Sequence, residues 1–240
     1  MVYVISELPM ARKKEKIIEF AKSLVEVSDI VDIPEAPLGF SSPSSPILSC
    51  IIKESIKEAN IITHLRLYDI NRLALINTIM GLRISGINDV LLLRGDQPKI
   101  GRKVEEITPD EGILLLRQHF KRLNVGLLIN LNKDLEEIEE RIKLKASFYL
   151  ITRPWYSKKL GSVSRMIRKN NSKLYIYFVI LTEKNREFLS RLIPKEEIVK
   201  IEELEERIEV VKEYIDGIVF SSPKDYHSLL TSLKIAGKIL

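Results

Sequence analysis

Cysteine is almost absent from this sequence, with Cys50 the only one among 240 residues. A single cysteine excludes an internal disulfide framework and a metal site built from cysteines, so we expect no metal centre. Glutamine is also scarce and occurs only as Gln97 and Gln118, whereas charged residues make up 30% of the chain. Few thermolabile residues together with many charges are typical of proteins from thermophiles.

Long apolar runs are missing too. No stretch approaches the roughly 18 apolar residues that a membrane helix needs, and the apolar N-terminal stretch is too short for a secretory signal. We therefore expect a cytoplasmic protein that does not associate with a membrane. Hydrophobic residues make up 45% of the chain, which is typical of a globular protein. Residues 1–240 are enough for a single domain with a sizeable core.

Blocks of basic residues interleaved with aromatics are also missing. The formal net charge is +5, but the Lys and Arg residues are interleaved with Glu, as they are over residues 12–16 and 136–141. A modest positive excess can attract an anionic cofactor or substrate. Because no basic block of the kind that binds nucleic acid is present, we expect no nucleic-acid partner.

Short segments rich in Ile, Val and Leu alternate with longer amphipathic segments. Because the short segments are apolar on both faces, they predict parallel strands that are buried on both sides. The strands are predicted over residues 2–6, 30–33, 61–65, 89–93, 125–129, 147–152, 173–180 and 217–221. This alternation predicts a single-domain (β/α)₈ barrel, with an open doubly wound sheet as the alternative. No Gly-x-Gly-x-x-Gly follows a predicted strand, which weakens the dinucleotide-binding version of that alternative.

Apolar residues recur at helical spacing between the predicted strands. Helices are predicted around 17–24, 52–59 and 73–80, the third with Asp69 as its N-cap, and over 113–123 after Thr108 and Pro109. Further helices are expected over 135–144, 157–168, 184–192, 201–214 and 226–239. His119 falls within one of these helices and His227 opens the last one, so we expect both to be structural or on the surface.

Polar residues follow most of the predicted strands. In a barrel these positions share one face, the C-terminal mouth, where the chemistry of such folds takes place. The stiff loop over residues 34–46, with four prolines and four serines, is expected on the same face. The polar positions, with one aromatic neighbour, are Glu7, Glu35, His64, Arg94, Gly95, Asp96, Asn130, Arg153, Trp155, Thr182, Ser221 and Ser222.

Glu7 and His64 are the candidates for acid–base chemistry. A partly desolvated carboxylate at a barrel mouth can act as a general acid, and the apolar neighbours Leu8, Pro9 and Met10 are expected to disfavour the charged form of Glu7. The alternative for Glu7 is a solvated loop residue. His64 can donate a hydrogen bond to a flavin or phosphate or exchange protons; alternatively it packs at the rim.

The segment 91–98 reads Leu-Leu-Leu-Arg-Gly-Asp-Gln-Pro and is the most specific part of the sequence. A hydrophobic strand leads into Arg94, Gly95 and Asp96. Glycine permits close approach of the backbone to a ligand, arginine can hold a phosphate, and aspartate can accept hydrogen bonds from ring N–H or amino groups. The tripeptide is informative because a buried strand precedes it and Pro98 follows.

Four segments in this order resemble the core of the methylenetetrahydrofolate reductases. That family reads His-Leu-Thr, a helix, Gly-Ile, an apolar strand and Leu-Arg-Gly-Asp-x-Pro at similar spacing. The corresponding segments here are 63–65 (THL), 69–72 (DINR), 86–90 (GINDV) and 93–98 (LRGDQP). Residues 6–9 (SELP) are similar to the family's first-strand motif, and weaker similarity continues through 151–152, 180–181 and 217–220, so the likeness covers most of the chain.

The resemblance implies a (β/α)₈ barrel that binds FAD. Members pass a hydride from NAD(P)H through flavin to 5,10-methylenetetrahydrofolate and give 5-methyltetrahydrofolate, a step of one-carbon metabolism and methionine biosynthesis. It further implies that Glu7 donates the proton that opens the five-membered ring and that Asp96 binds the pterin and influences the flavin. His64, Arg94 and Gly95 are implied as flavin contacts, and Arg153 as a substrate contact.

Two segments differ from the family pattern. Residues 127–133 (LLINLNK) stand where the family has an aromatic-Pro-x-x-His-Pro segment that touches flavin, and Arg153 stands where the family has a glutamine that helps to hold folate. Three interpretations stay open. The chain is a flavin-dependent reductase of a methylene-tetrahydropterin, a relative with an altered or lost flavin site that uses another electron donor, or a pterin-binding or partner subunit. A homo-oligomer is compatible with each.

Overall fold

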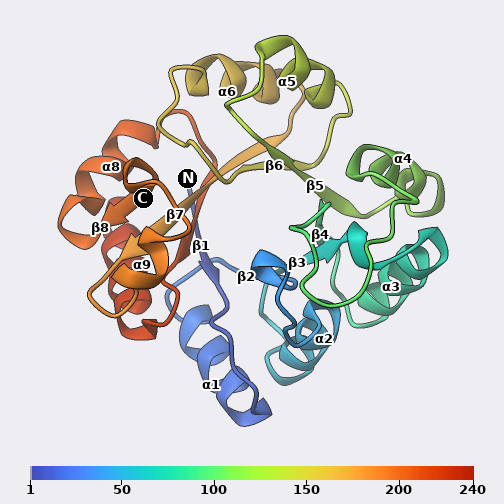
Figure 1. The fold of residues 1–240 in the computed structure, drawn as a ribbon, viewed down its shortest axis with the longest axis horizontal. Coiled ribbons are helices and arrows are strands. Elements are labelled where there is room, and N and C mark those ends of the chain that lie inside the picture. Colours follow the sequence, from blue (N-terminus) through green and yellow to red (C-terminus); the bar gives the residue numbers. More distant parts are fainter. Residues whose placement is uncertain (1) are drawn as a thin grey trace.

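Parallel strands close into an eight-stranded barrel with helices around its outside (Figure 1). The computed structural model describes residues 2–240, with the side chain of Glu196 excepted. The barrel strands are β1 (Tyr3–Glu7), β2 (Ile30–Ile33), β3 (Ile61–Arg66), β4 (Asp89–Leu93), β5 (Asn124–Ile129), β6 (Phe148–Ile151), β7 (Lys173–Leu181) and β9 (Gly217–Ser221). The predicted fold class and all the predicted strands are thereby confirmed.

The ring closes because β9 lies between β7 and β1. Strand β1 pairs with both β2 and β9, β9 pairs with β7, and β7 pairs with β6, always in parallel. A further strand, β8 (Ile198–Lys200), pairs with Val179–Leu181 at the end of β7 and stays outside the ring. This strand was not predicted, since three residues are too few for a periodic pattern.

The helices pack their apolar stripes against the outside of the sheet. They are α1 (Lys14–Val25), α2 (Ser45–Ser55), α3 (Arg72–Ile84), α4 (Pro109–His119), α5 (Leu135–Ile142), α6 (Leu160–Lys169), α7 (Arg186–Ser190), α8 (Leu204–Val211) and α9 (Tyr226–Ile239). Helix α4 begins as predicted, since Thr108 and Glu111 form a reciprocal capping box before and within its first turn.

Several helix ends differ from the predictions. Asn71, not Asp69, caps α3 by accepting a hydrogen bond from the Ala74 N–H, because Asp69 belongs to a preceding 3-10 turn. Helix α2 already ends at Ser55, so the apolar positions 56 and 59 fill the following turn. Helices α6, α7 and α8 are shorter than predicted because turns precede them.

The inside of the barrel has its own apolar core. Residues alternate between facing the helices and facing the barrel axis along each strand, and the inward positions bring Ile5, Leu91, Phe148 and Tyr175 together. Gly126 is required here, since a Cβ at this position would lie 2.1 Å from the Phe148 ring. Side chains therefore fill the barrel toward the N-terminal ends of its strands.

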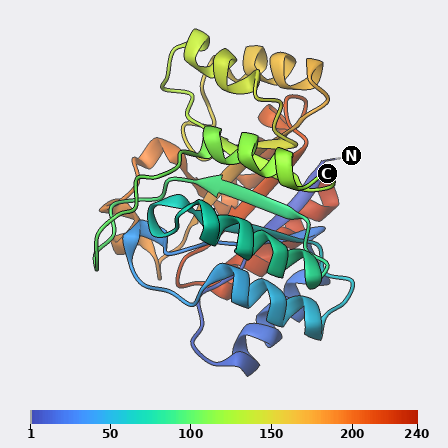
Figure 2. The same ribbon diagram turned by 90° about the vertical axis from the view of Figure 1, so that its right-hand side faces the viewer.

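The two ends of the barrel differ in what they carry. Figure 2 places the N- and C-termini on one side and the long green loop between β4 and α4 on the other, at the C-terminal ends of the strands. Within residues 2–240, no helix is long and apolar enough to cross a membrane.

Candidate functional site

Five polar side chains follow one another around the inner wall at the mouth. They come from consecutive strands of the ring and continue the inward alternation set by the apolar core below them. We call this set the polar arc: Tyr177 on β7, Ser221 on β9, Glu7 on β1, Asp32 on β2 and His64 on β3. The alternation thus puts the predicted acid, Glu7, and His64 on the inner wall of the same mouth.

Glu7 ends β1 with both carboxyl oxygens engaged. Ser221 donates to Oε1 at 2.6 Å, and the Tyr177 hydroxyl lies against Oε2. Desolvation inside the barrel raises the pKa of Glu7, and the charge of Asp32 raises it further, whereas the hydrogen bonds from Ser221 and Tyr177 and the charge of His64 act against this. The net upward shift of the pKa favours the protonated form, as a general acid requires.

The source of this desolvation differs from the predicted one. Leu8 follows Glu7 and, by alternation, lies on the opposite side of β1, where it packs in the outer core. Met10 is exposed. The Glu7 carboxyl is therefore desolvated by the barrel interior and the polar arc. The predicted rise of its pKa is correct, but the apolar sequence neighbours do not cause it.

Asp32 and His64 form the second pair of the polar arc. Asp32 Oδ1 lies 2.7 Å from His64 Nε2, and the two side chains are 1% and 12% exposed. Burial alone lowers the pKa of His64, but the charge and hydrogen bond of Asp32 raise it, with smaller contributions from Glu7 and Glu35, and the net direction is upward. The pair therefore favours an imidazolium beside a carboxylate.

A second group of charged side chains, Glu35, Arg66 and Asp69, lies at or just after the ends of β2 and β3 at the mouth. Glu35 accepts a hydrogen bond from the Ser45 N–H, and burial raises its pKa. Arg66 is 2% exposed, donates to the Ala36 carbonyl oxygen and lies 2.9 Å from Asp69. Within residues 2–240 no group of three or more His, Cys, Asp or Glu side chains is arranged to hold a metal ion.

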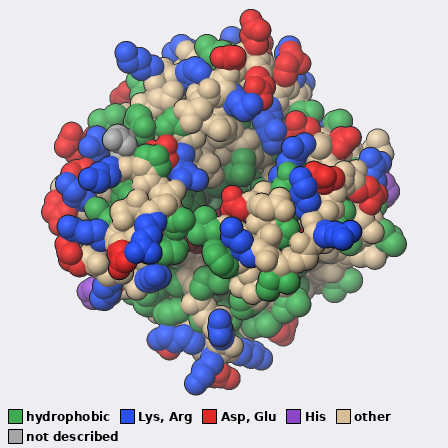
Figure 3. Space-filling view, viewed as in Figure 1, with side chains coloured by type: hydrophobic (Ala, Val, Ile, Leu, Met, Phe, Trp, Pro, Cys, Tyr) green, Lys and Arg blue, Asp and Glu red, His purple; other side chains and the backbone are tan. Residues whose placement is uncertain are grey.

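The wall opposite the polar arc is apolar. The inward positions there are Leu93 on β4, Leu128 on β5 and Leu150 on β6. Figure 3 looks onto the mouth, where the face is hollowed near its centre and hydrophobic side chains lie around the hollow; charged side chains lie both near the hollow and toward the edge.

The Arg94–Asp96 tripeptide lies on the loop after β4, at the same mouth but outside the polar arc. Arg94 and Asp96 are exposed, and neither side chain forms a hydrogen bond or ion pair within residues 2–240. Gly95 has a φ of +87°, and a Cβ there would lie 2.5 Å from Arg66 Cγ. The close approach that requires glycine is thus made by the Arg66 side chain.

The remaining predicted positions are divided between the rim and the core. Arg153 is half-exposed on the loop after β6, 3.5 Å from Glu197, whereas Trp155 is buried and packs on Phe178. Asn130 accepts a hydrogen bond from the Asn132 N–H. Ser222 and Thr182 keep buried hydroxyl oxygens without a partner within residues 2–240.

Three residues of the mouth were missed from the sequence: Asp32, Arg66 and Tyr177. Positions at or just after the ends of the predicted strands were considered. Asp32 and Tyr177 lie inside the strands predicted over 30–33 and 173–180, whereas Arg66 directly follows the predicted strand 61–65 and was passed over. A charged residue between Val31 and Ile33, in a strand of four residues, was the available signal for Asp32. Tyr177 and Arg66 can be found by extending the inward alternation along their strands.

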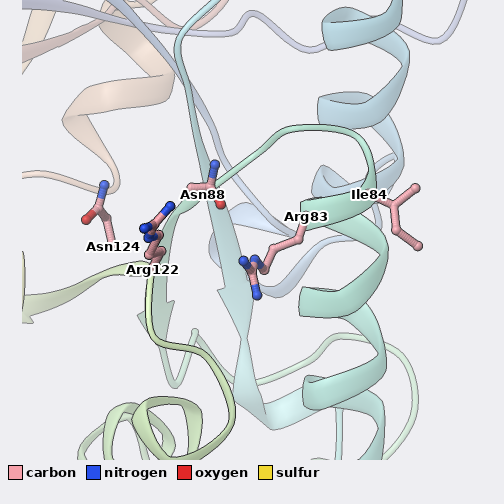
Figure 4. Close-up of a pocket in the computed structure, with 5 residues that line it drawn as sticks. All are labelled: Arg83, Ile84, Asn88, Arg122 and Asn124. Atoms are coloured by element: carbon pink, nitrogen blue, oxygen red, sulfur yellow. The ribbon is translucent and has the colours of Figure 1, made fainter.

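An open depression lies at the other end of the barrel, around the starts of β4 and β5. Arg83, Ile84, Asn88, Arg122 and Asn124 line it (Figure 4). All five are exposed, and Arg83 lies over the Phe120 ring. No titratable side chain of the polar arc lies at this end, so we place the candidate site at the mouth.

Comparisons with known proteins support the fold and extend no further. No family model and no curated protein sequence matches the chain. Among solved structures, a chain of tryptophan synthase from M. tuberculosis is 13% identical, with a TM-score of 0.62 over 98% of this chain and 90% of its own. Phosphoribosylanthranilate isomerase from Thermotoga maritima is 15% identical, with a TM-score of 0.55 over 99% and 98%. Such likeness concerns the barrel alone.

Proposed function

We propose that the mouth binds a methylene-tetrahydropterin, such as 5,10-methylenetetrahydrofolate, and that the protein reduces it to the 5-methyl form with Glu7 as the proton donor. The observation that carries the proposal is the partly buried, doubly hydrogen-bonded Glu7 carboxyl with its raised pKa at the end of β1. The order of the sequence motifs, which resembles that of the methylenetetrahydrofolate reductases, supplies the substrate class.

The reaction needs one hydride and one proton. The hydride adds to the methylene carbon, the bond from that carbon to one ring nitrogen breaks, and the proton goes to the nitrogen that leaves. Glu7 delivers this proton, and its carboxylate then keeps the hydrogen bond from Ser221. NAD(P)H is the electron donor in this proposal and leaves as NAD(P)⁺, so atoms and electrons balance.

FAD is the cofactor implied by the resemblance, and its predicted contacts do not come together as a cradle. His64 is already bonded to Asp32, Gly95 is covered by Arg66, and Arg94 is exposed on the loop. We therefore derive no step through FAD. The flavin carrier stays a prediction from the sequence, and the visible absorbance spectrum of the purified protein, with analysis of released cofactor, tests it.

The central experiment measures binding and turnover separately. Wild-type protein is titrated with 5-methyltetrahydrofolate by calorimetry, and reduction of 5,10-methylenetetrahydrofolate is followed with NADH or NADPH, each with and without added FAD. We expect saturable binding and turnover. Binding without turnover under all conditions favours the second candidate, a pterin-binding or partner subunit. This candidate is supported by the predicted flavin contacts, which do not come together as a cradle. Absence of binding overturns the proposal.

A further inference from the structure

Asp32 lies in the polar arc, and the proton transfer assigned to Glu7 does not use it. It is a charged residue in the middle of a short apolar strand, and its side chain is 1% exposed. Burying a carboxylate is unfavourable unless it is paired and hydrogen-bonded. Its one hydrogen-bond partner within residues 2–240 is His64, and its second oxygen, Oδ2, has none.

The contact with Asp32 determines which atom of the His64 ring is left for a ligand. An ionised carboxylate only accepts hydrogen bonds, so the proton between the two residues belongs to Nε2. The structure gives the other ring nitrogen, Nδ1, no hydrogen-bond partner within residues 2–240, and the side chain keeps 12% of its surface exposed. Nδ1 is therefore the ring nitrogen that remains available at the mouth.

The groups that surround the ring favour its charged form. Asp32 faces it from β2, Glu7 from β1 and Glu35 from the loop after β2, and each raises the pKa of His64 against the opposing effect of burial. Below this raised pKa both ring nitrogens carry hydrogen, and Nδ1 is a donor. Above it Nδ1 becomes an acceptor, while Nε2 stays bonded to Asp32.

We propose that Asp32 is a positioning residue that fixes the His64 ring so that Nδ1 donates a hydrogen bond to an acceptor atom of the ligand in the mouth. A ring carbonyl oxygen, which a pterin carries, is such an acceptor. The inference rests on the proposed function in taking a pterin as the ligand. The orientation of the ring rests on the contact with Asp32 alone.

The orientation is tested on the wild-type protein by nitrogen-15 NMR of its histidines. The chain has three, and His119 and His227 are exposed and serve as internal references. We expect Nε2 of His64 to carry hydrogen across the whole titration and only Nδ1 to lose it. A neutral ring protonated on Nδ1 overturns the proposal, and this measurement requires no variant.

The same spectra of Asp32→Asn measure what the carboxylate contributes. We expect the titration midpoint of His64 to fall in this variant and those of His119 and His227 to stay unchanged. Asp29→Asn is the matched control, because Asp29 precedes the same strand at the other end of the barrel, and it should leave all three midpoints unchanged. An unchanged His64 midpoint in Asp32→Asn contradicts the proposal.

A double-mutant cycle on binding tests whether Asp32 acts through His64. The ligand is 5-methyltetrahydrofolate, whose binding involves no proton transfer from Glu7. His64→Gln is expected to weaken binding by about tenfold or more, and Asp32→Asn should weaken it in wild-type protein but add nothing in the His64→Gln background. Additive losses overturn the proposal. Absence of binding by wild-type protein removes the proposed function, and the NMR experiment then still decides the ring orientation.

Discussion

The polar arc and the loop segment Arg94–Pro98 both lie at the mouth, but their side chains are held differently. In the arc, Glu7 and His64 are fixed by partners from neighbouring strands, at 2.6 Å from Ser221 and 2.7 Å from Asp32. In the loop, Arg94 and Asp96 are exposed and make no side-chain contact of this kind within residues 2–240. The arc is organised without a ligand, whereas the side chains of Arg94 and Asp96 are left free to contact one.

This difference assigns separate tasks to the two regions. Pre-organised groups act on charge that develops during a reaction, because they need no rearrangement at that moment. Exposed loop side chains contribute binding energy but first lose conformational freedom. We therefore expect substitutions of Glu7 and Tyr177 in the arc to affect the rate and its pH dependence. Substitutions in the loop, like those of Asp32 and His64, should affect affinity.

The largest effect is expected for Glu7→Gln. Glutamine keeps the shape and most of the hydrogen bonds but cannot donate the proton, and general acid catalysis is typically worth about 10²–10⁴-fold. Reduction of 5,10-methylenetetrahydrofolate, measured as kcat, should fall by that order. Binding of 5-methyltetrahydrofolate should change little. A variant that reduces the methylene substrate at the wild-type rate would remove the role of Glu7.

Tyr177→Phe should have a smaller effect that concerns the pH profile. The bond from Tyr177 lowers the pKa of Glu7, so its removal raises that pKa further. Activity needs the protonated carboxyl and is lost as pH rises through the pKa, so the alkaline limb of kcat against pH should move to higher pH. Loss of this partly buried hydrogen bond is expected to lower the free energy of unfolding by about 1 kcal/mol.

The control for Tyr177→Phe is Tyr156→Phe, which removes a hydroxyl from an exposed tyrosine of the mouth. This variant should leave both the pH profile and the denaturation midpoint unchanged. If the alkaline limb moves to lower pH in Tyr177→Phe, the hydrogen bond does not act on Glu7 in the stated direction.

Asp96→Ala should weaken pterin binding without weakening the fold. An exposed carboxylate buries little surface, whereas a ring donor left unpaired in a binding site costs about 1–3 kcal/mol. Calorimetric titration with 5-methyltetrahydrofolate measures the affinity, and urea denaturation measures the stability. Equal affinity of the two proteins would show that the loop does not hold the pterin.

The smallest effect is expected at the other end of the barrel. Arg83→Ala combined with Arg122→Ala removes two cations from the depression in Figure 4, on the face away from the polar arc. Exposed substitutions of this kind usually change stability by no more than about 0.5 kcal/mol each, and we expect unchanged affinity and rate. A clear loss of pterin binding would contradict the placement of the binding site at the mouth.

The barrel could be predicted from the sequence because its strands are buried on both faces and bounded by polar turns. A short run that is apolar on both faces, such as Asp89–Leu93, is typical of a buried parallel strand. Helix ends were harder to predict: Asn71 caps α3 because Asp69 lies in the preceding 3-10 turn, where it pairs with Arg66. Such contacts between side chains of the folded chain leave no periodic signal.

The site was predictable in part. Glu7 directly follows the strand predicted over 2–6, and His64 lies near the end of the strand predicted over 61–65, and both were found for that reason. Their partners Asp32 and Tyr177 lie further inside their strands, and which side chains meet across the barrel depends on the register of neighbouring strands. Gly95 was correctly marked as a position of close approach, but the approaching group, Arg66, comes from a different strand.

The hydrogen bond from Ser221 to Glu7 joins residues 214 positions apart in the chain. The acid therefore acquires this partner only when the last strand, β9, inserts between β7 and β1 and closes the ring. Contacts of such long sequence separation form late, because the entropy of closing the intervening chain must be overcome first. During synthesis on the ribosome, the polar arc stays incomplete until β9 has emerged, so the proposed activity requires the closed ring.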